Sequence, residues 1–141
     1  MSDERWVKVS LCIRSKTLDA DHIHQAIGVK PSRLGNRGEL VSKRSPQAGV
    51  RDHALCIFES PLASSDTLQE HLDWLSNFLK THGASLRSLA KACDFDVRIG
   101  FSSGSGQGGF VLDSAPLGDL AALGIALYVD LYPSEGDGAP D

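Results

Sequence analysis

The sequence lacks the features that mark several large classes of protein. Its three cysteines, Cys12, Cys56 and Cys93, are too few and too scattered for a disulfide framework or a zinc knuckle. No apolar run approaches the roughly 20 residues that a membrane-spanning helix needs, and the first residues carry no apolar signal segment. These absences predict a cytoplasmic protein with no membrane partner, whose cysteines are small buried side chains.

The chain also lacks an overall basic charge, which argues against nucleic acid as its partner. Its formal net charge is −4, and its 141 residues are 41% hydrophobic and 23% charged. Residues 1–51 hold ten Lys/Arg and five Asp/Glu, giving +5, whereas residues 52–141 hold four and thirteen, giving −9. Such asymmetry is typical of a basic region that meets an anionic partner, or of two surfaces that meet within a fold or a dimer.

We expect one α+β domain over residues 1–133 and a disordered acidic tail over residues 134–141. Residues 125–132 alternate between an apolar face and a face that carries Asp130 between two tyrosines, and their β-branched and aromatic content predicts a central strand. Residues 6–14 and 95–101 alternate in the same way and predict half-buried strands. Residues 53–59 are apolar on both faces, so this strand should lie well inside the sheet.

Apolar residues at helical spacing predict a long helix from about residue 65 to residue 83, followed by a second short helix. An earlier helix should begin after Asp19 as N-cap and end at Gly28, and another should span residues 116–123. Weaker patterns indicate an edge strand within 39–43 and a short strand at 110–112.

The order of these elements predicts a mainly antiparallel sheet with helices on one face, built from a ferredoxin-like βαββαβ core and a C-terminal β-α-β extension. The long helix should cross the apolar face of the sheet. That face would carry Val9, Leu11, Val97, Ile99, Val129 and Leu131.

The sequence predicts no catalytic residue, no metal site and no cofactor. Residues 104–109 satisfy the G-x-G-x-x-G pattern, but no helix follows to receive a pyrophosphate, so we expect a hairpin turn without nucleotide binding. No nucleophile elbow or paired-carboxylate pattern is present. Four histidines are expected to be solvated or to cap helices because none shows metal-ligand spacing: His22, His24, His71 and His82.

The strongest local departure from average composition is a basic stretch rich in Gly and Pro. Between residues 30 and 51 a single acid, Glu39, stands against Lys30, Arg33, Arg37, Lys43, Arg44 and Arg51. Loops on a rigid scaffold commonly carry binding groups, and guanidinium groups bind carboxylate or phosphate oxygens bidentately. A solvated loop and an anion-binding surface are both open interpretations.

Two further residues have a structural and a functional interpretation. His53 opens a buried strand and follows the basic stretch, so it is either a hydrogen-bonded structural histidine or part of a site. Asp130 lies between Tyr128 and Tyr132 in an otherwise apolar strand, where a carboxylate needs a partner. It either pairs with a basic residue such as Lys8 or Arg98 or lines a pocket.

Several stretches taken together resemble one known family. They are Asp19-Ala-Asp-His-Ile-His-Gln-Ala-Ile-Gly-Val-Lys-Pro-Ser32, the pair Gly38-Glu39, the strand ending Ile57-Phe-Glu-Ser60, and Leu117-Gly-Asp-Leu-Ala-Ala-Leu-Gly-Ile-Ala-Leu-Tyr-Val-Asp-Leu-Tyr132. In this combination the chain resembles the bacterial family catalogued as domain of unknown function 4279. A tryptophan usually begins the middle strand in that family, whereas this chain has His53. The resemblance implies a bacterial protein and supplies no reaction, because the family is functionally uncharacterised.

Our first hypothesis is a non-enzymatic binding or interaction module that recognises a small anionic ligand or an acidic protein surface. The protein would act as a monomer or a homodimer. The expected binding residues are Lys30, Arg33, Arg37, Arg51, His53, Tyr128 and Asp130. The alternative is a small hydrolase or transferase with a site near His53, Asp130 and Arg51.

Overall fold

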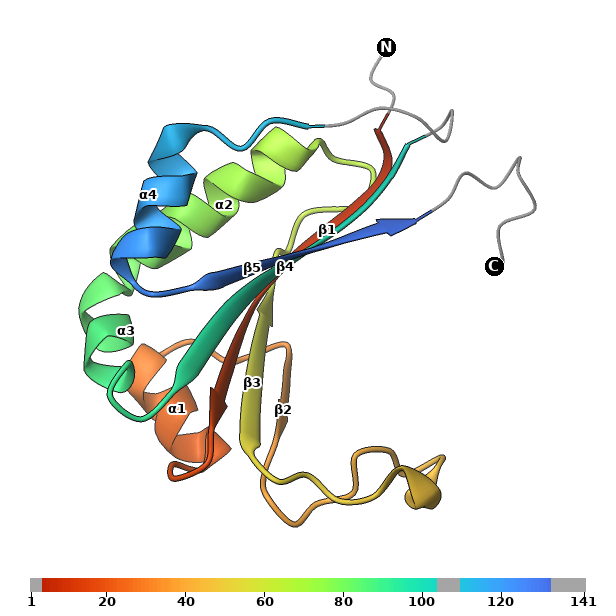
Figure 1. Cartoon of the computed structure of the whole chain (residues 1–141), viewed down its shortest axis with the longest axis vertical. Coiled ribbons are helices and arrows are strands. Elements are labelled where there is room, and N and C mark those ends of the chain that lie inside the picture. Colours follow the sequence, from red (N-terminus) through yellow and green to blue (C-terminus); the bar gives the residue numbers. More distant parts are fainter. Residues whose placement is uncertain (1–3, 104–109, 133–141) are drawn as a thin grey trace.

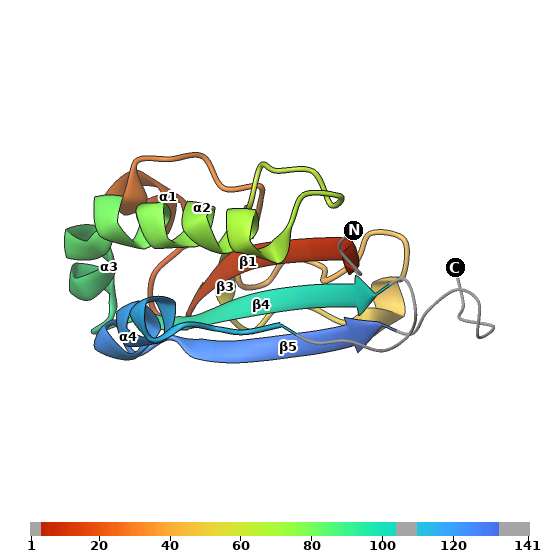
Figure 2. The same cartoon turned by 90° about the horizontal axis from the view of Figure 1, so that it is seen from above.

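The structure is a computed structural model that describes residues 4–103 and 110–132. Within these residues, five strands form one sheet, and four α-helices lie together on one side of it (Figures 1 and 2). The predicted α+β class is confirmed. The predicted glycine turn at 104–109 and the predicted tail at 134–141 lie outside the described residues.

The sheet is mixed. Its strands are β1 (Glu4–Ser15), β2 (Arg33–Gly35), β3 (Ala54–Glu59), β4 (Asp94–Ser103) and β5 (Ala126–Tyr132), in the spatial order β2-β3-β1-β4-β5. Three neighbouring pairs are antiparallel, but β5 pairs parallel with β4. The predicted interior position of β3 is confirmed, whereas the predicted central position of β5 is wrong, because it forms one edge of the sheet.

The core lies between the sheet and the helices α1 (Ala20–Ile27), α2 (Leu68–Thr81), α3 (Gly83–Leu89) and α4 (Ser114–Ala122). As predicted, α2 lies against β1, and no more than 1% of the surface of Val9, Leu11, Val97 or Ile99 is exposed. Two members of the predicted apolar face differ, since Val129 is 40% and Leu131 is 72% exposed. They lie on the edge strand, beyond the part of the sheet that α2 covers.

Local signals placed the helix ends well. The Asp19 side chain accepts a hydrogen bond from the backbone N–H of His22 at 2.8 Å, and Gly28 ends α1 with a φ of 82°. Thr67 caps α2 by accepting from the N–H of Glu70, slightly later than predicted. None of the helices in the described ranges is long and apolar enough to cross a membrane.

Three local predictions were wrong. The edge strand next to β3 is β2 rather than residues 39–43, where Leu40 forms only an isolated bridge with Val50. Residues 110–112 are not a strand. His71 is not solvated: it is 1% exposed, and its ring nitrogens lie 2.8 Å from Ser60 Oγ and 2.9 Å from the Ala63 carbonyl oxygen.

Candidate functional site

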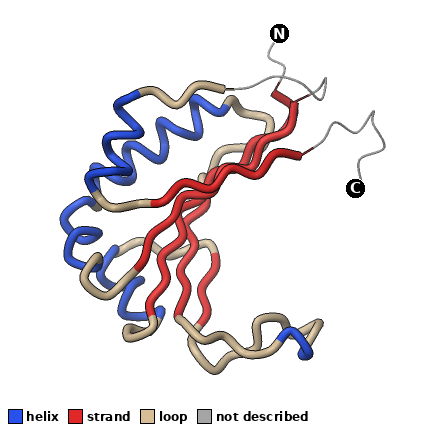
Figure 3. Tube along the Cα trace, in the orientation of Figure 1, coloured by secondary structure: helices blue, strands red, loops and turns tan. Residues whose placement is uncertain are grey.

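The chain leaves β2 and returns to β3 through a protruding loop, residues 36–52, which we call the basic arm (Figures 1 and 3). Backbone hydrogen bonds join its two sides. Gly38 N donates to Arg51 O at 2.9 Å, Arg51 N donates to Glu39 O at 2.8 Å, and Val41 N donates to Gly49 O at 3.0 Å. The arm therefore has a defined, hairpin-like backbone.

Side chains fix the root of the arm to the rest of the fold. The Arg51 side chain crosses Gly35 so closely that a Cβ on this glycine would lie 2.5 Å from Arg51 Nε. Asn36 Oδ1 accepts a hydrogen bond from Ala20 N at 2.7 Å, which ties the root to the start of α1. The Glu39 carboxylate accepts from Asn36 N at 2.6 Å, so the single acid in the first half of the arm already has a donor.

The arm exposes both cationic and apolar side chains. Arg37, Lys43 and Arg44 are exposed and make no ion pair with any residue that the structure describes. Beside them, three apolar side chains are more exposed than is usual for their type: Leu40 at 43%, Val41 at 45% and Val50 at 61%. The arm thus presents a surface on which free positive charge and apolar area occur together.

Two of the predicted basic residues differ from the others. Arg33 lies on β2, where its Nε is 3.5 Å from Glu59 Oε1, and Lys8 Nζ lies 3.6 Å from the other oxygen of the same carboxylate. The Arg51 side chain packs against Gly35 at the root of the arm. Lys30 is exposed on the connection before β2. The basic stretch is therefore divided between structural cations and free ones.

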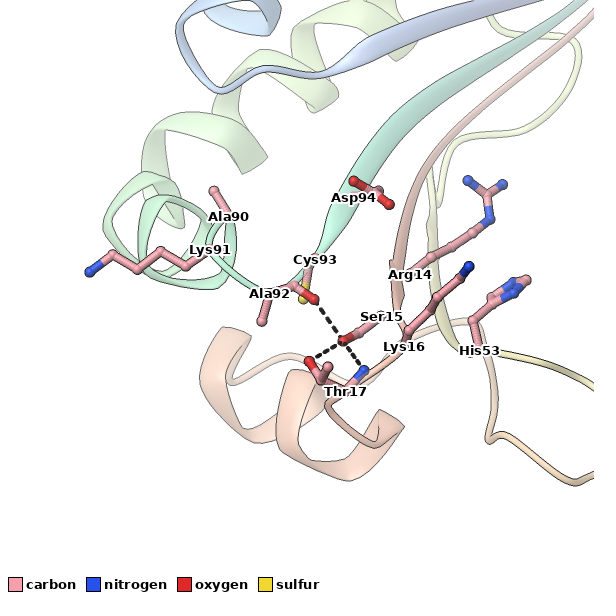
Figure 4. A pocket seen from close by; sticks show the side chains of 10 residues that line it. All are labelled: Arg14, Ser15, Lys16, Thr17, His53, Ala90, Lys91, Ala92, Cys93 and Asp94. Atoms are coloured by element: carbon pink, nitrogen blue, oxygen red, sulfur yellow. Dashed lines mark hydrogen bonds between the residues drawn. The ribbon is translucent and has the colours of Figure 1, made fainter.

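A hollow of about 390 Å³ lies between the end of β1 and the connection from α3 to β4, and His53, which follows the arm, lines one side of it (Figure 4). Arg14, Lys16 and His53 lie on one side of it, and the Lys91 side chain points away from them. Asp94 supplies a carboxylate, and the remaining lining residues are Ser15, Thr17, Ala90, Ala92 and Cys93. The hollow therefore brings basic side chains and one carboxylate together.

His53 has a carboxylate neighbour on the arm. Its Nδ1 lies 2.5 Å from Asp52 Oδ1. The hydrogen bond and the charge of His53, with a smaller contribution from Lys16, hold the pKa of Asp52 below its usual value. The Ser15 hydroxyl is not poised as a nucleophile, because it donates to the Ala92 carbonyl at 2.7 Å and accepts from Leu18 N at 2.9 Å.

The sheet face opposite the helices carries a network of charged side chains beside Tyr128. Asp96 on β4 is 3% exposed and forms ion pairs with Arg14 and with Arg98, whose Nε lies 3.2 Å from Asp96 Oδ1. The Arg98 guanidinium lies 5.1 Å from the centre of the Tyr128 ring. This network was not predicted, although alternation placed its residues on polar strand faces.

Asp130 does not pair as expected. Lys8 binds Glu59 and Arg98 binds Asp96, so neither of the expected partners reaches it. Asp130 is exposed, lies in register with Gly100, and makes no ion pair within the two described ranges. Near it, Trp6 and Tyr132 meet edge to face at 5.1 Å above Gly100, where a Cβ would lie 2.6 Å from the indole.

The structure separates the predicted site residues into two groups. Arg33, Arg37, Arg51 and His53 belong to the β2–β3 end of the sheet, whereas Tyr128 and Asp130 belong to β5, with β1 and β4 between. Across the sheet, Asp130 is in register with Gly100 and through it with Lys8 on β1. His53 precedes Ala54, which is in register with Ser15 on β1. Seven residues along a strand span about 23 Å, so His53 and Asp130 do not form one site.

Among the residues that the structure describes, no group of three or more His, Cys, Asp or Glu side chains could hold a metal ion. The three cysteines are free and buried, as predicted. Burial raises the pKa of Cys56 to about 11, so its thiol is unreactive at neutral pH.

Comparison with known proteins gives one match. A family model described as Domain of unknown function (DUF4279) matches residues 5–134, nearly the whole chain. No curated protein and no solved structure matches the chain.

Proposed function

The chain belongs to the DUF4279 family, a domain of unknown function, and from that premise we propose that it is a non-enzymatic interaction module that binds an acidic segment of a partner protein through the basic arm. One observation carries the proposal. The arm is held by backbone hydrogen bonds and exposes unpaired cations beside apolar side chains.

Each property of the arm favours binding. Cations that have no internal partner can pair with carboxylates of another protein without breaking an existing ion pair, and exposed apolar groups add a contribution from buried area. A preformed loop also loses less conformational entropy on binding than a disordered one. Because the whole chain has a net charge of −4, the positive arm would orient an acidic partner toward this end of the molecule.

The hollow extends this surface. His53 follows the last residue of the arm, and Arg14 and Lys16 lie beside it at the same end of the sheet. A partner segment that lies along the arm could therefore place one carboxylate, or a phosphate, in the hollow. Lys16 makes no ion pair with the described residues and could receive this group, whereas the Arg14 guanidinium is already paired with Asp96.

The test is binding of a fluorescent peptide that alternates Glu with Leu, measured by anisotropy at low and high salt. The arm variant is Arg37→Glu with Arg44→Glu, and the matched control is Lys80→Glu with Arg87→Glu, which makes the same change in net charge on α2 and α3. Arg33 is left unchanged because its reversal would create repulsion with Glu59.

We expect the arm variant to weaken binding by about tenfold or more at low salt and the control to bind like the parent. The parent's affinity should fall as salt rises, since exposed charges are screened. Equal losses in both variants would mean that the peptide responds only to net charge. Unchanged binding by the arm variant would remove the arm from the site.

A second candidate function is a small hydrolase or transferase, favoured by the Asp52–His53 pair beside the hollow. A carboxylate that orients an imidazole is a common arrangement for a general base. Asp130 is too distant to take part, so such a site would consist of His53 with Arg14 and Lys16. Turnover of simple phosphate or acyl esters that disappears in folded His53→Ala would support this function, and a parent without turnover would reject it.

We also propose that β1 to β4, with α1 and α2, form a ferredoxin-like unit within one domain of a cytoplasmic bacterial protein. The order β2-β3-β1-β4 with antiparallel pairing supports the first part, and three buried free cysteines support a reducing compartment. Limited proteolysis should leave one resistant fragment that includes β5. A fragment that ends before β5 and stays folded would show that the extension is separable.

A further inference from the structure

The outer side of β5 is an open sheet edge. Among the described residues no strand lies beyond it, and it is seven residues long. Side chains on both of its faces are exposed: Val129 at 40% and Leu131 at 72% on one, Tyr128 at 54% and Tyr132 at 51% on the other. A long apolar edge is a template for pairing with another strand, and the usual protection by lysine, proline or a bulge is absent from these residues.

We propose that two copies of the chain associate by antiparallel pairing of β5 with β5 of the second copy, about a two-fold axis at Val129. The two sheets would join into one continuous sheet. Isologous pairing of this kind is the commonest symmetry of soluble oligomers, and it satisfies the unpaired backbone groups of both edges.

The sequence of β5 selects this register. Val129 is the midpoint of Ala126–Tyr132, so an axis at this residue pairs the whole length of the strand. Residues directly opposite each other in an antiparallel pair point to the same face. Tyr128 would therefore face Asp130 of the second copy. An axis at Asp130 would instead set two carboxylates against each other, which is unfavourable, and would leave part of each strand unpaired.

Charge complementarity supports the same register. Asp130 makes no ion pair with the described residues of its own chain. The Arg98 guanidinium lies 5.1 Å above the Tyr128 ring, and its Nε is the atom that binds Asp96. Asp130 of the second copy would lie one strand spacing, about 4.8 Å, beyond Tyr128. Each copy would thus offer an arginine to the free carboxylate of the other.

The opposite face of the strand is complementary in its apolar side chains. In this register Val129 faces Val129 of the second copy, and Leu127 faces Leu131. Leu127 is already half-buried against the core, whereas Leu131 is the most exposed apolar side chain of β5. Pairing would cover Leu131 with a leucine that belongs to the second core, which removes apolar area from water on both copies.

Disulfide trapping tests the axis directly. Residues opposite each other in an antiparallel pair have Cα atoms about 4.5 to 5.5 Å apart, within the range a disulfide accepts. The variant Val129→Cys should therefore crosslink under mild oxidation. In Leu131→Cys the two thiols would be four residues out of register, about 13 Å apart, and should not crosslink. The native cysteines are buried and do not compete.

The control is demanding because Leu131 is more exposed than Val129. If crosslinking only reflects exposure, Leu131→Cys will crosslink at least as fast, and the proposal is wrong. Sedimentation of the unmodified protein gives an independent result: a concentration-dependent dimer is expected, and a monomer at all concentrations overturns the proposal. The variant Tyr128→Lys should strengthen this dimer, whereas Tyr128→Glu, facing Asp130, should weaken it; equal effects would reject the register.

Discussion

The two edges of the sheet differ in length, charge and exposed chemistry. The β2 edge has three residues, is paired through Arg33 to Glu59, and continues into the basic arm. The β5 edge has seven residues and a single charge, Asp130, among exposed apolar and aromatic side chains. Both expose apolar surface, but only the β2 end surrounds it with free cations.

This difference indicates two kinds of partner. An edge that carries unpaired cations repels a copy of itself and attracts an acidic surface. An edge whose register is self-complementary and nearly uncharged suits a second copy of the same chain. Both edges belong to one sheet with a shared core. If the edges serve only for binding, substitutions there should leave the stability of the core unchanged.

The largest effect is expected in the core. Leu75 on α2 is 2% exposed, so Leu75→Ala should lower the free energy of unfolding by about 2 to 5 kcal/mol through lost contacts and a cavity. Leu131→Ala and Leu40→Ala, at the two edges, should change it by no more than about 0.5 kcal/mol in the dilute monomer. Urea denaturation followed by circular dichroism measures all three. A small effect at Leu75 would mean that α2 is misplaced.

Two aspartates on the open face of the sheet provide a second comparison. Asp96 is buried between two arginines, whereas Asp130 is exposed on β5. Asp96→Ala should cost about 1 to 3 kcal/mol, since it removes charged hydrogen bonds and leaves two arginines without their acceptor. Asp130→Ala should be nearly neutral for a dilute monomer. Urea unfolding measures both variants. Equal losses of unfolding free energy would contradict the burial of Asp96 on β4 and the exposure of Asp130 on β5.

Thiol chemistry distinguishes the buried interior from the edge. At pH 8 the native cysteines should react slowly with a thiol reagent, whereas Leu131→Cys should add one fast-reacting thiol.

Burial raises the pKa of Cys56 from 9.0 to about 11. The stabilisation linked to this shift is therefore complete below about pH 9 and is lost as the pH rises through about 11. Cys56→Ala should reduce this alkaline loss in unfolding experiments; an unchanged profile would assign the loss to other groups.

The smallest expected effect is an absence of coupling between the edges. Arg37→Glu with Arg44→Glu should leave the sedimentation of the protein unchanged, because the arm and β5 lie at opposite ends of the sheet order. Likewise, Tyr128→Glu should leave peptide binding unchanged. A clear effect of either variant at the other edge would show that the two surfaces act together.

Local features of the fold were predictable from the sequence, and positions in the sheet were not. Asp19 and Gly28 determine the ends of α1 through their own side chain and backbone, so both were predicted correctly. β1 and β5 show the same alternation, yet the apolar residues of β1 are buried and Leu131 is exposed. Alternation identifies a strand but carries no information about which distant strands pair beside it.

In the candidate site, too, local features were predictable and contacts between distant residues were not. Composition alone identified the basic stretch, but its hairpin-like form depends on Gly38, Val41 and Arg51 bonding across the loop. The hollow beside His53 was missed because Arg14 and Lys16 come from a remote part of the chain. The burial of Asp96 was missed for a similar reason, since an arginine on the neighbouring strand provides one of its ion pairs.

Hydrogen exchange of backbone amides can test the central claim, that the two edges have different occupants, in a single experiment. Adding the acidic Glu/Leu peptide should slow exchange in the arm, where Gly38, Val41 and Arg51 donate hydrogen bonds, and leave β5 unchanged. Raising the protein concentration should slow exchange in β5 and leave the arm unchanged. Peptide protection of β5, concentration-dependent protection of the arm, or no response at either edge would contradict the account.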